Sequence, residues 1–173
     1  FGLRNTPKIV SGIDAESLDL TKLVYEQVAD TVIPVSSLET AEMVKVYTNV
    51  FRNVNIALVN EIARLCKVCG VSVWEMLNTA AKKPFGYMPF VPGSVGGHCI
   101  PLDPYYLATK AREYDFHVRF IELAADINER MPYYVVGQVA AALNERGKML
   151  NKSKVLVLGA AYKKDVGDVR ESP

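Results

Sequence analysis

The sequence has no excess charge of either sign and no long apolar run, and each absence excludes a class of protein. Twenty Lys and Arg balance nineteen Asp and Glu, so the formal net charge is +1. The charge that drives nonspecific binding to nucleic acid or to an anionic membrane is therefore missing. No apolar run approaches the roughly 20 residues that cross a bilayer. We expect neither nucleic acid nor a membrane as a partner.

Cysteine, proline and glycine are also scarce, at three, nine and eleven of 173 residues. Three thiols cannot all pair within one chain, and a protein of this size buries enough core without disulfides. The first residues lack a basic stretch followed by an apolar signal core. We therefore expect a cytoplasmic protein with reduced thiols. Because the chain starts at Phe1 and stops at Pro173 within an apparent motif, we also expect a fragment of a longer protein.

The N-terminal residues 1–37 have the pattern of the end of an α/β domain. A short apolar strand is predicted at 8–12, a helix over 18–28 and a second strand at 31–35. No glycine-rich turn follows the first strand, so this segment alone does not define a nucleotide site.

Residues 38–150 are predicted to be mainly helical. An uninterrupted helical pattern runs from Ser37 to about Gly70, and shorter helices are expected over 71–81, 105–114, 119–130 and 132–147. Apolar residues recur along the long helix at Val44, Phe51, Leu58 and Leu65, flanked by Val46, Val50, Val54 and Ile62. A stripe this wide needs more than one covering neighbour, which favours pairing with a second copy of the helix.

The fold class expected is a mainly α central domain between two partial α/β segments. The second of these occupies 151–173, where residues 154–159 (Lys-Val-Leu-Val-Leu-Gly) are typical of a buried parallel strand.

The irregular stretch 82–104 holds the most informative residues. Gly96 and Gly97 allow close backbone approach and precede His98 and Cys99. A loop cysteine can act as a nucleophile toward a carbonyl carbon, and Asp103 could orient a water or a base. A packed loop thiol is the alternative interpretation of Cys99, and a hydrogen-bonding loop residue is the simplest interpretation of His98.

Lys45, Asn49 and Arg52 project from one face of the long helix, because they stand at i, i+4 and i+7. These three side chains can be interpreted either as a solvated helix face or as part of a site. Near a thiol, however, a Lys and Asn pair could stabilise the oxyanion of a tetrahedral intermediate.

Cys66-x-x-Cys69 resembles half of a metal or redox motif. A structural zinc site needs four ligands, and no second cysteine pair is present. We interpret the two cysteines as small buried hydrophobic residues and predict no metal site.

Four segments in order, Ala41–Asn55, Lys83–Phe90, Gly96–Pro104 and Gly159–Pro173, resemble the UDP-glucose/GDP-mannose dehydrogenase family. The resemblance implies an N-terminal Rossmann domain for NAD, a central dimerisation domain with a 6-phosphogluconate-dehydrogenase-like helical core, and a C-terminal domain for the nucleotide sugar. It is strongest to the branch that oxidises UDP-N-acetylglucosamine at C6, with UDP-glucose as the alternative substrate. The residue that distinguishes NAD from NADP lies outside this sequence.

The same resemblance implies roles for individual residues. Cys99 matches the family's nucleophile, Lys45 and Asn49 the pair that stabilises the oxygen, and Asp103 the carboxylate near the thiol. Arg170 matches a cofactor contact. We assign the UDP-sugar site to Arg52, Phe90, Gly96, Gly97, Tyr162 and Lys163. The hypothesis from another class is a noncatalytic helical interaction module, in which Cys99 has no special reactivity.

Overall fold

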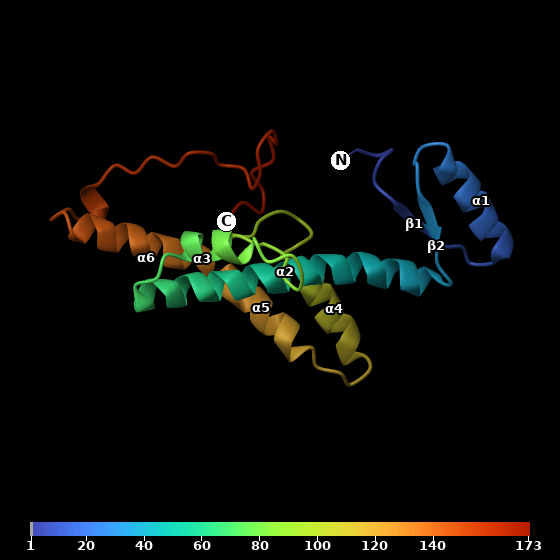
Figure 1. Ribbon diagram of the computed structural model, residues 1–173, viewed down its shortest axis with the longest axis horizontal. Coiled ribbons are helices and arrows are strands. Elements are labelled where there is room, and N and C mark those ends of the chain that lie inside the picture. Colours follow the sequence, from blue (N-terminus) through green and yellow to red (C-terminus); the bar gives the residue numbers. More distant parts are fainter. Residues whose placement is uncertain (1) are drawn as a thin grey trace. The chain divides into compact units, whose positions relative to one another are not determined.

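The computed structural model describes residues 2–173, which form two compact units. The first extends to Thr48 and the second runs from Asn49 to Pro173. Helices dominate, and the one sheet of the described residues has two strands (Figure 1). The expected mainly helical fold with a small α/β segment is confirmed to that extent.

The first unit begins with the predicted strand, helix and strand. β1 (Lys8–Val10) pairs in parallel with β2 (Val32–Pro34), and α1 (Ala15–Glu26) connects them. Asp14 caps α1 because its side chain accepts a hydrogen bond from the amide of Ser17 at 2.8 Å. That bond lowers the pKa of the Asp14 carboxyl.

The long helix α2 (Leu38–Cys69) matches the predicted helix closely. At its start, Ser37 Oγ accepts a hydrogen bond from the amide of Thr40 at 3.1 Å. It ends where Gly70 adopts a positive φ of 70°, a conformation that other residues rarely take. The boundary between the two units falls within this helix.

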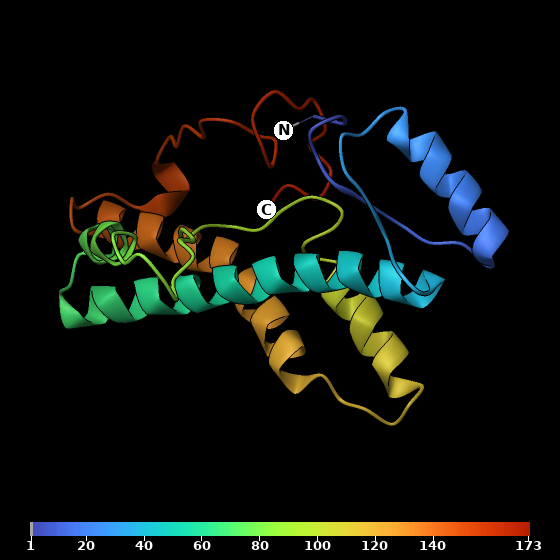
Figure 2. The same cartoon turned by 45° about the vertical axis from the view of Figure 1, so that its right-hand side comes forward.

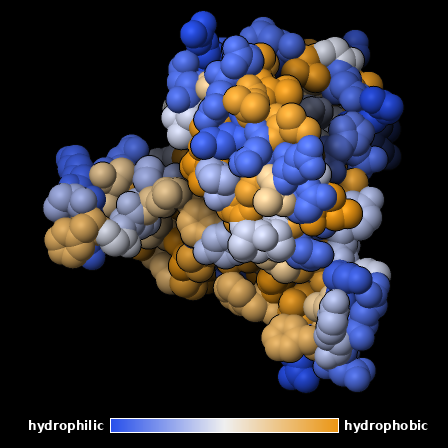
Figure 3. Space-filling view, turned by 90° about the vertical axis from the view of Figure 1, so that its right-hand side faces the viewer, coloured by the Kyte–Doolittle hydropathy of each residue, from blue (hydrophilic) through white to orange (hydrophobic). Residues whose placement is uncertain are grey.

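The buried face of α2 differs from the apolar stripe of the sequence. Asn49, Asn53, Ala57 and Asn60, spaced four, four and three residues apart, are buried on one side. Leu58 and Leu65 of the stripe remain 57% and 54% exposed. Apolar side chains reach the surface among hydrophilic ones in the space-filling view (Figure 3).

Four further helices complete the second unit: α3 (Val73–Ala80), α4 (Asp103–Arg112), α5 (Arg119–Glu129) and α6 (Met131–Asn144). Each lies within three residues of its predicted bounds. Small buried side chains at Ala108 of α4 and at Ala124 and Ala125 of α5 allow these two helices to pack closely.

The helix α6 lies along the C-terminal half of α2 in both ribbon views (Figures 1 and 2). Lys67 of α2 donates a hydrogen bond to Gln138, and the Arg64 guanidinium lies 5.4 Å from the centre of the Tyr134 ring. The second unit therefore has α2 as its central element.

The strand predicted at 154–159 is absent, and that expectation was wrong. After a short 3₁₀ helix (Leu150–Lys152), the segment is irregular, and Val155 to Leu158 are exposed. A strand is stabilised by a hydrogen-bonded neighbour, and neither β1 nor β2, the strands of the described residues, pairs with this segment. None of the helices between residues 2 and 173 has the length and apolar character of a membrane span.

Candidate active site

The loop between α3 and α4 is held against α2 by asparagine side chains. Asn60 Nδ2 donates to the carbonyl of Gly93 at 3.0 Å, and the amide of Gly93 donates back to Asn60 Oδ1 at 2.8 Å. Asn53 Nδ2 donates to the carbonyl of Ile100 at 3.1 Å. These bonds anchor the loop before and after Cys99.

Asn128 of α5 connects the two anchoring asparagines. Its Oδ1 accepts from Asn60 at 2.9 Å, and its Nδ2 donates to the backbone carbonyl of Asn53 at 2.9 Å. All three side chains are buried, and Asn53 Oδ1 has no hydrogen-bond partner among the described residues. Buried amides are costly unless paired, so this chain of bonds fixes the loop firmly.

Asn53, Asn60 and Asn128 were not among the site residues predicted from the sequence. A signal was present, because Asn49, Asn53 and Asn60 share a helix face by their spacing. Polar residues that repeat on a buried helix face have to be hydrogen-bonded to something other than the helix itself.

Cys99 is exposed at the end of the anchored loop. Its backbone carbonyl accepts hydrogen bonds from the amides of Leu102 and Asp103, at 3.2 and 2.9 Å. This turn leads directly into α4, whose first residue is Asp103. The loop thus presents the thiol to solvent and brings Asp103 back to the same turn.

Asn49 joins Arg52 to Asp103. Arg52 Nη2 donates to Asn49 Oδ1, and Asn49 Nδ2 donates to Asp103 Oδ2, both at 2.5 Å. A guanidinium can only donate and a carboxylate can only accept, so the two partners together fix the orientation of the amide. Of the predicted polar residues, the structure brings together Asn49, Arg52 and Asp103. Lys45 is exposed on α2 in the first unit.

The glycine pair lies against the C-terminal segment. A Cβ on Gly96 would come within 2.6 Å of Pro173 Cδ and 2.8 Å of Tyr162 Cβ. Gly97 has a φ of 92°, faces the Tyr162 ring, and donates its amide to the carbonyl of Glu171 at 3.0 Å. Both positions therefore require glycine.

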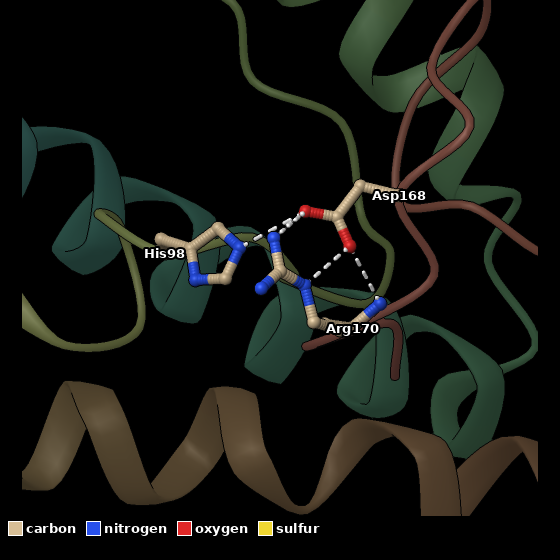
Figure 4. Close-up of polar contacts among 3 residues, drawn as sticks. All are labelled: His98, Asp168 and Arg170. Atoms are coloured by element: carbon tan, nitrogen blue, oxygen red, sulfur yellow. Dashed lines mark hydrogen bonds and ion pairs between the residues drawn. The ribbon is translucent and has the colours of Figure 1, made fainter.

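The neighbouring residues of that segment form an ionic cluster (Figure 4). Arg170 donates through Nε and Nη2 to the two carboxylate oxygens of Asp168, each at 2.9 Å, and His98 Nε2 lies 3.3 Å from Asp168 Oδ2. The guanidinium lowers the pKa of Asp168, and Asp168 raises the pKa of Arg170. The interpretation of His98 as a hydrogen-bonding loop residue is confirmed.

The other predicted site residues occupy separate positions. Lys163 Nζ lies 5.6 Å from the centre of the Tyr162 ring. Phe90 contacts Phe51 of α2 edge to face, with ring centres 6.0 Å apart, and lines an apolar pocket with Leu58, Met76 and Met88.

The Cys66-x-x-Cys69 motif is not a paired site. Cys66 is buried as expected, but Cys69 is exposed, contrary to expectation, because it ends α2. In the part of the chain that the structure describes, no three His, Cys, Asp or Glu side chains are grouped to hold a metal ion.

The anchored loop thus carries an exposed thiol at the turn that leads to Asp103, whose carboxylate accepts a hydrogen bond from Asn49. Comparison with known proteins identifies the family. The sequence profile of the UDP-glucose/GDP-mannose dehydrogenase family, central domain, matches residues 39–130. The chain belongs to this family.

Individual relatives agree. UDP-N-acetyl-D-mannosamine dehydrogenase of Methanococcus vannielii is 38% identical over 166 residues, which are 96% of this chain. UDP-N-acetyl-D-glucosamine 6-dehydrogenase of Salmonella typhi is 36% identical over 171 residues, which are 98% of this chain. The chain spans 38% and 40% of these two proteins.

A solved structure gives the same result. That of UDP-D-ManNAc dehydrogenase from Pyrococcus horikoshii matches with a TM-score of 0.89 at 36% identity, covering 98% of this chain and 40% of that chain.

Proposed function

We propose that the protein to which this chain belongs oxidises the C6 alcohol of a UDP-sugar to the uronic acid in two steps, with NAD as cofactor and Cys99 as nucleophile. The observation that supports this most directly is the 2.5 Å hydrogen bond from Asn49 to Asp103, at the turn that carries the exposed Cys99. It groups an amide donor, a carboxylate and a thiol around one loop.

Each of these groups has a task in the reaction. The Cys99 thiolate adds to the C6 aldehyde left by the first hydride transfer and forms a thiohemiacetal. Loss of a second hydride gives a thioester on the same sulfur, and water releases the acid and the thiolate. Four electrons leave the sugar, two at each oxidation.

Asn49 and Lys45 are proposed to stabilise the negative oxygen of the tetrahedral stages. Asn49 keeps a second Nδ2 hydrogen for this purpose, because Asp103 accepts only one. Asp103 is proposed to orient the hydrolytic water.

One residue of this chain, Arg170, has the chemistry to bind a phosphate group of a dinucleotide cofactor. The Arg170 side chain is 77% exposed, and Asp168 pairs with its Nε and Nη2, which leaves Nη1 for a phosphate oxygen. NAD accepts hydride when bound. Residues 11–14, between β1 and α1, contain a single glycine and no glycine-rich phosphate loop, so we propose that residues 1–173 alone do not turn over.

The substrate is proposed to be a UDP-N-acetylhexosamine, since the relatives above are named for UDP-N-acetyl-D-mannosamine and UDP-N-acetyl-D-glucosamine. Tyr162 and Lys163 are proposed to hold the nucleotide sugar beside Gly96 and Gly97, together with Arg52 and Phe90. UDP-glucose is the third candidate substrate to be tested.

The test uses the full-length protein with each of the three UDP-sugars and measures NADH and uronic acid. We expect two NADH per acid, and no acid from Cys99→Ala, because no other side chain of the loop can hold a thioester. Cys69→Ala is the matched control, since Cys69 is also exposed. Acid production by Cys99→Ala at the wild-type rate would refute the cysteine mechanism, whereas no acid from wild-type protein with any of the three UDP-sugars would favour the helical interaction module.

A further inference from the structure

The C-terminal segment 160–173 contacts the loop at the two residues that directly precede Cys99. Gly97 donates its amide to Glu171, the ring of Tyr162 lies on Gly97, and the imidazole of His98 reaches Asp168. This segment also carries Arg170. The loop with the thiol and the segment with the arginine therefore meet at Gly97 and His98.

Asp168 contacts both Arg170 of the C-terminal segment and His98 of the loop. Its Oδ1 accepts from the Arg170 backbone amide at 3.0 Å and from Nε at 2.9 Å, while Oδ2 accepts from Nη2 at 2.9 Å. Oδ2 also lies 3.3 Å from His98 Nε2. In Figure 4 the dashed contacts from both side chains end on this carboxylate. The Asp168 side chain is only 27% exposed, against 46% for His98 and 77% for Arg170.

We propose that Asp168 is a positioning residue that couples Arg170 to the Cys99 loop through His98. The coupling rests on the proposed function, because it gives Arg170 its role at the cofactor. An arginine side chain has several rotatable bonds and loses conformational entropy when it binds a phosphate. The two-point pair with Asp168 orders the guanidinium beforehand, and the His98 contact fixes Asp168 relative to the thiol loop.

Only a carboxylate can serve all these partners at once. Its two oxygens accept four hydrogen bonds here, and its negative charge strengthens each of them. An asparagine of the same shape offers one oxygen and an NH₂ group, and the NH₂ would face a guanidinium nitrogen or the imidazole. Asp168→Asn therefore changes the contacts without changing the volume.

The experiment measures the KM for NAD, and kcat at saturating NAD, in the full-length protein. Asp168→Asn is expected to raise the KM for NAD by about threefold, the size expected for partly exposed ion pairs, with kcat within about twofold. His98→Ala is expected to raise the same KM, although His98 lies in the thiol loop. His98→Gln should restore it, because the glutamine amide can still donate to Asp168.

A second readout does not depend on activity. The amide of Gly97 is hydrogen-bonded to Glu171, so its hydrogen exchange reports how firmly the segment lies on the loop. Both Asp168→Asn and His98→Ala should speed this exchange by about threefold. Asp115→Asn is the control, since Asp115 is exposed in the turn between α4 and α5 and has a positive φ of 55° that asparagine tolerates. It should change neither quantity.

The outcomes separate the two proposals. If wild-type protein reduces NAD but His98→Ala leaves its KM unchanged, the coupling is refuted and the proposed function stands. If wild-type protein reduces no NAD with any UDP-sugar, the proposed function fails. In that case unchanged Gly97 exchange in Asp168→Asn refutes the coupling, and faster exchange supports the contact between loop and segment.

Discussion

Asn60 of α2 and Gly93 of the loop exchange two hydrogen bonds in opposite directions, so that a side-chain amide pairs with the backbone as a neighbouring strand would. Asn60 is fully buried and also donates to Asn128. It is the first of the fixed points that hold the loop carrying Cys99, and its contribution to stability can be measured.

Asn60→Ala should lower the free energy of unfolding by about 2 to 4 kcal/mol. The substitution leaves the amide and carbonyl of Gly93 and the side chain of Asn128 without their partner, and unpaired buried polar groups are costly. Denaturant unfolding provides the measurement. Asn55→Ala is the matched control, since the Asn55 side chain donates to the carbonyl of Phe51 in its own helix rather than to the loop. If Asn60→Ala lowered the free energy of unfolding no more than Asn55→Ala does, the Asn60 bonds would not be what anchors the loop.

A second prediction concerns the amide and the lysine proposed for the oxyanion. In the full-length protein, Asn49→Ala and Lys45→Ala should each lower kcat by about 10²-fold, as for removal of one oxyanion donor. The KM for the UDP-sugar should change much less. Steady-state kinetics of both variants test this role. An effect confined to KM would instead assign the residues to uniform substrate binding.

Gly96 and Gly93 give a third prediction, since both lie in the same loop but in different surroundings. A Cβ on Gly96 would meet Pro173, Tyr162 and the carbonyl of Glu171 within 2.8 Å, whereas one on Gly93 meets nothing within 4 Å. Overpacking costs roughly 1 to 3 kcal/mol. Gly96→Ala should therefore displace the segment that carries Tyr162 and raise the KM for the UDP-sugar by about tenfold. Gly93→Ala should not, and equal effects would contradict the contact.

The fourth prediction is a dependence on pH. Burial raises the pKa of Tyr105 to about 12, with a further contribution from the 2.9 Å hydrogen bond that its hydroxyl donates to Glu129. The folded state holds this proton more tightly than the unfolded state, whose tyrosine has a pKa near 10. The stabilisation is therefore complete below about pH 10 and is lost as the pH rises toward about 12. As the pH rises from about 10 to about 12, wild type should therefore lose stability relative to Tyr105→Phe in denaturant unfolding. A constant difference would contradict the shift.

The local elements of the fold could be predicted from the sequence because their signals are local. The helical run to Cys69 and the proline at position 132 in the first turn of α6 each mark a boundary without knowledge of neighbours. The prediction of a strand at 154–159 was wrong because a strand depends on a nonlocal signal. An apolar run becomes a strand only when another strand pairs with it, and that partner is not encoded in the run itself.

The site was predictable in part for a similar reason. Cys99 and Asp103 stand in one short motif, and Asn49 and Arg52 are one helical turn apart, so each pair is local, although the bond that joins the two pairs spans 54 residues. Asn53 and Asn128 are far apart in the sequence and meet only when α5 packs on α2. Asp168 was missed because its partner His98 is 70 residues away.

The last prediction concerns the exposed stripe on α2. Leu58 and Leu65 are more than half exposed although they belong to the longest helix of the described residues, while the opposite face is buried. Contiguous exposed apolar side chains usually mark an interface, and two-fold pairing of one helix with its copy is the simplest closed arrangement. We propose that the chain forms a homodimer through this stripe. An obligate interface typically buries about 2,000 Å² or more, so the dimer should persist at micromolar concentration.

Sedimentation equilibrium of residues 1–173 tests the dimer directly. Wild-type protein should sediment at twice the 19.1 kDa of one chain, and Leu58→Glu with Leu65→Glu should shift it to the monomer, since two charges would be buried at the contact. Leu156→Glu is the control, because Leu156 is 82% exposed but lies outside α2. A 19.1 kDa wild-type species throughout that range would refute the dimer, and dissociation by the control variant alone would locate the contact on the C-terminal segment instead.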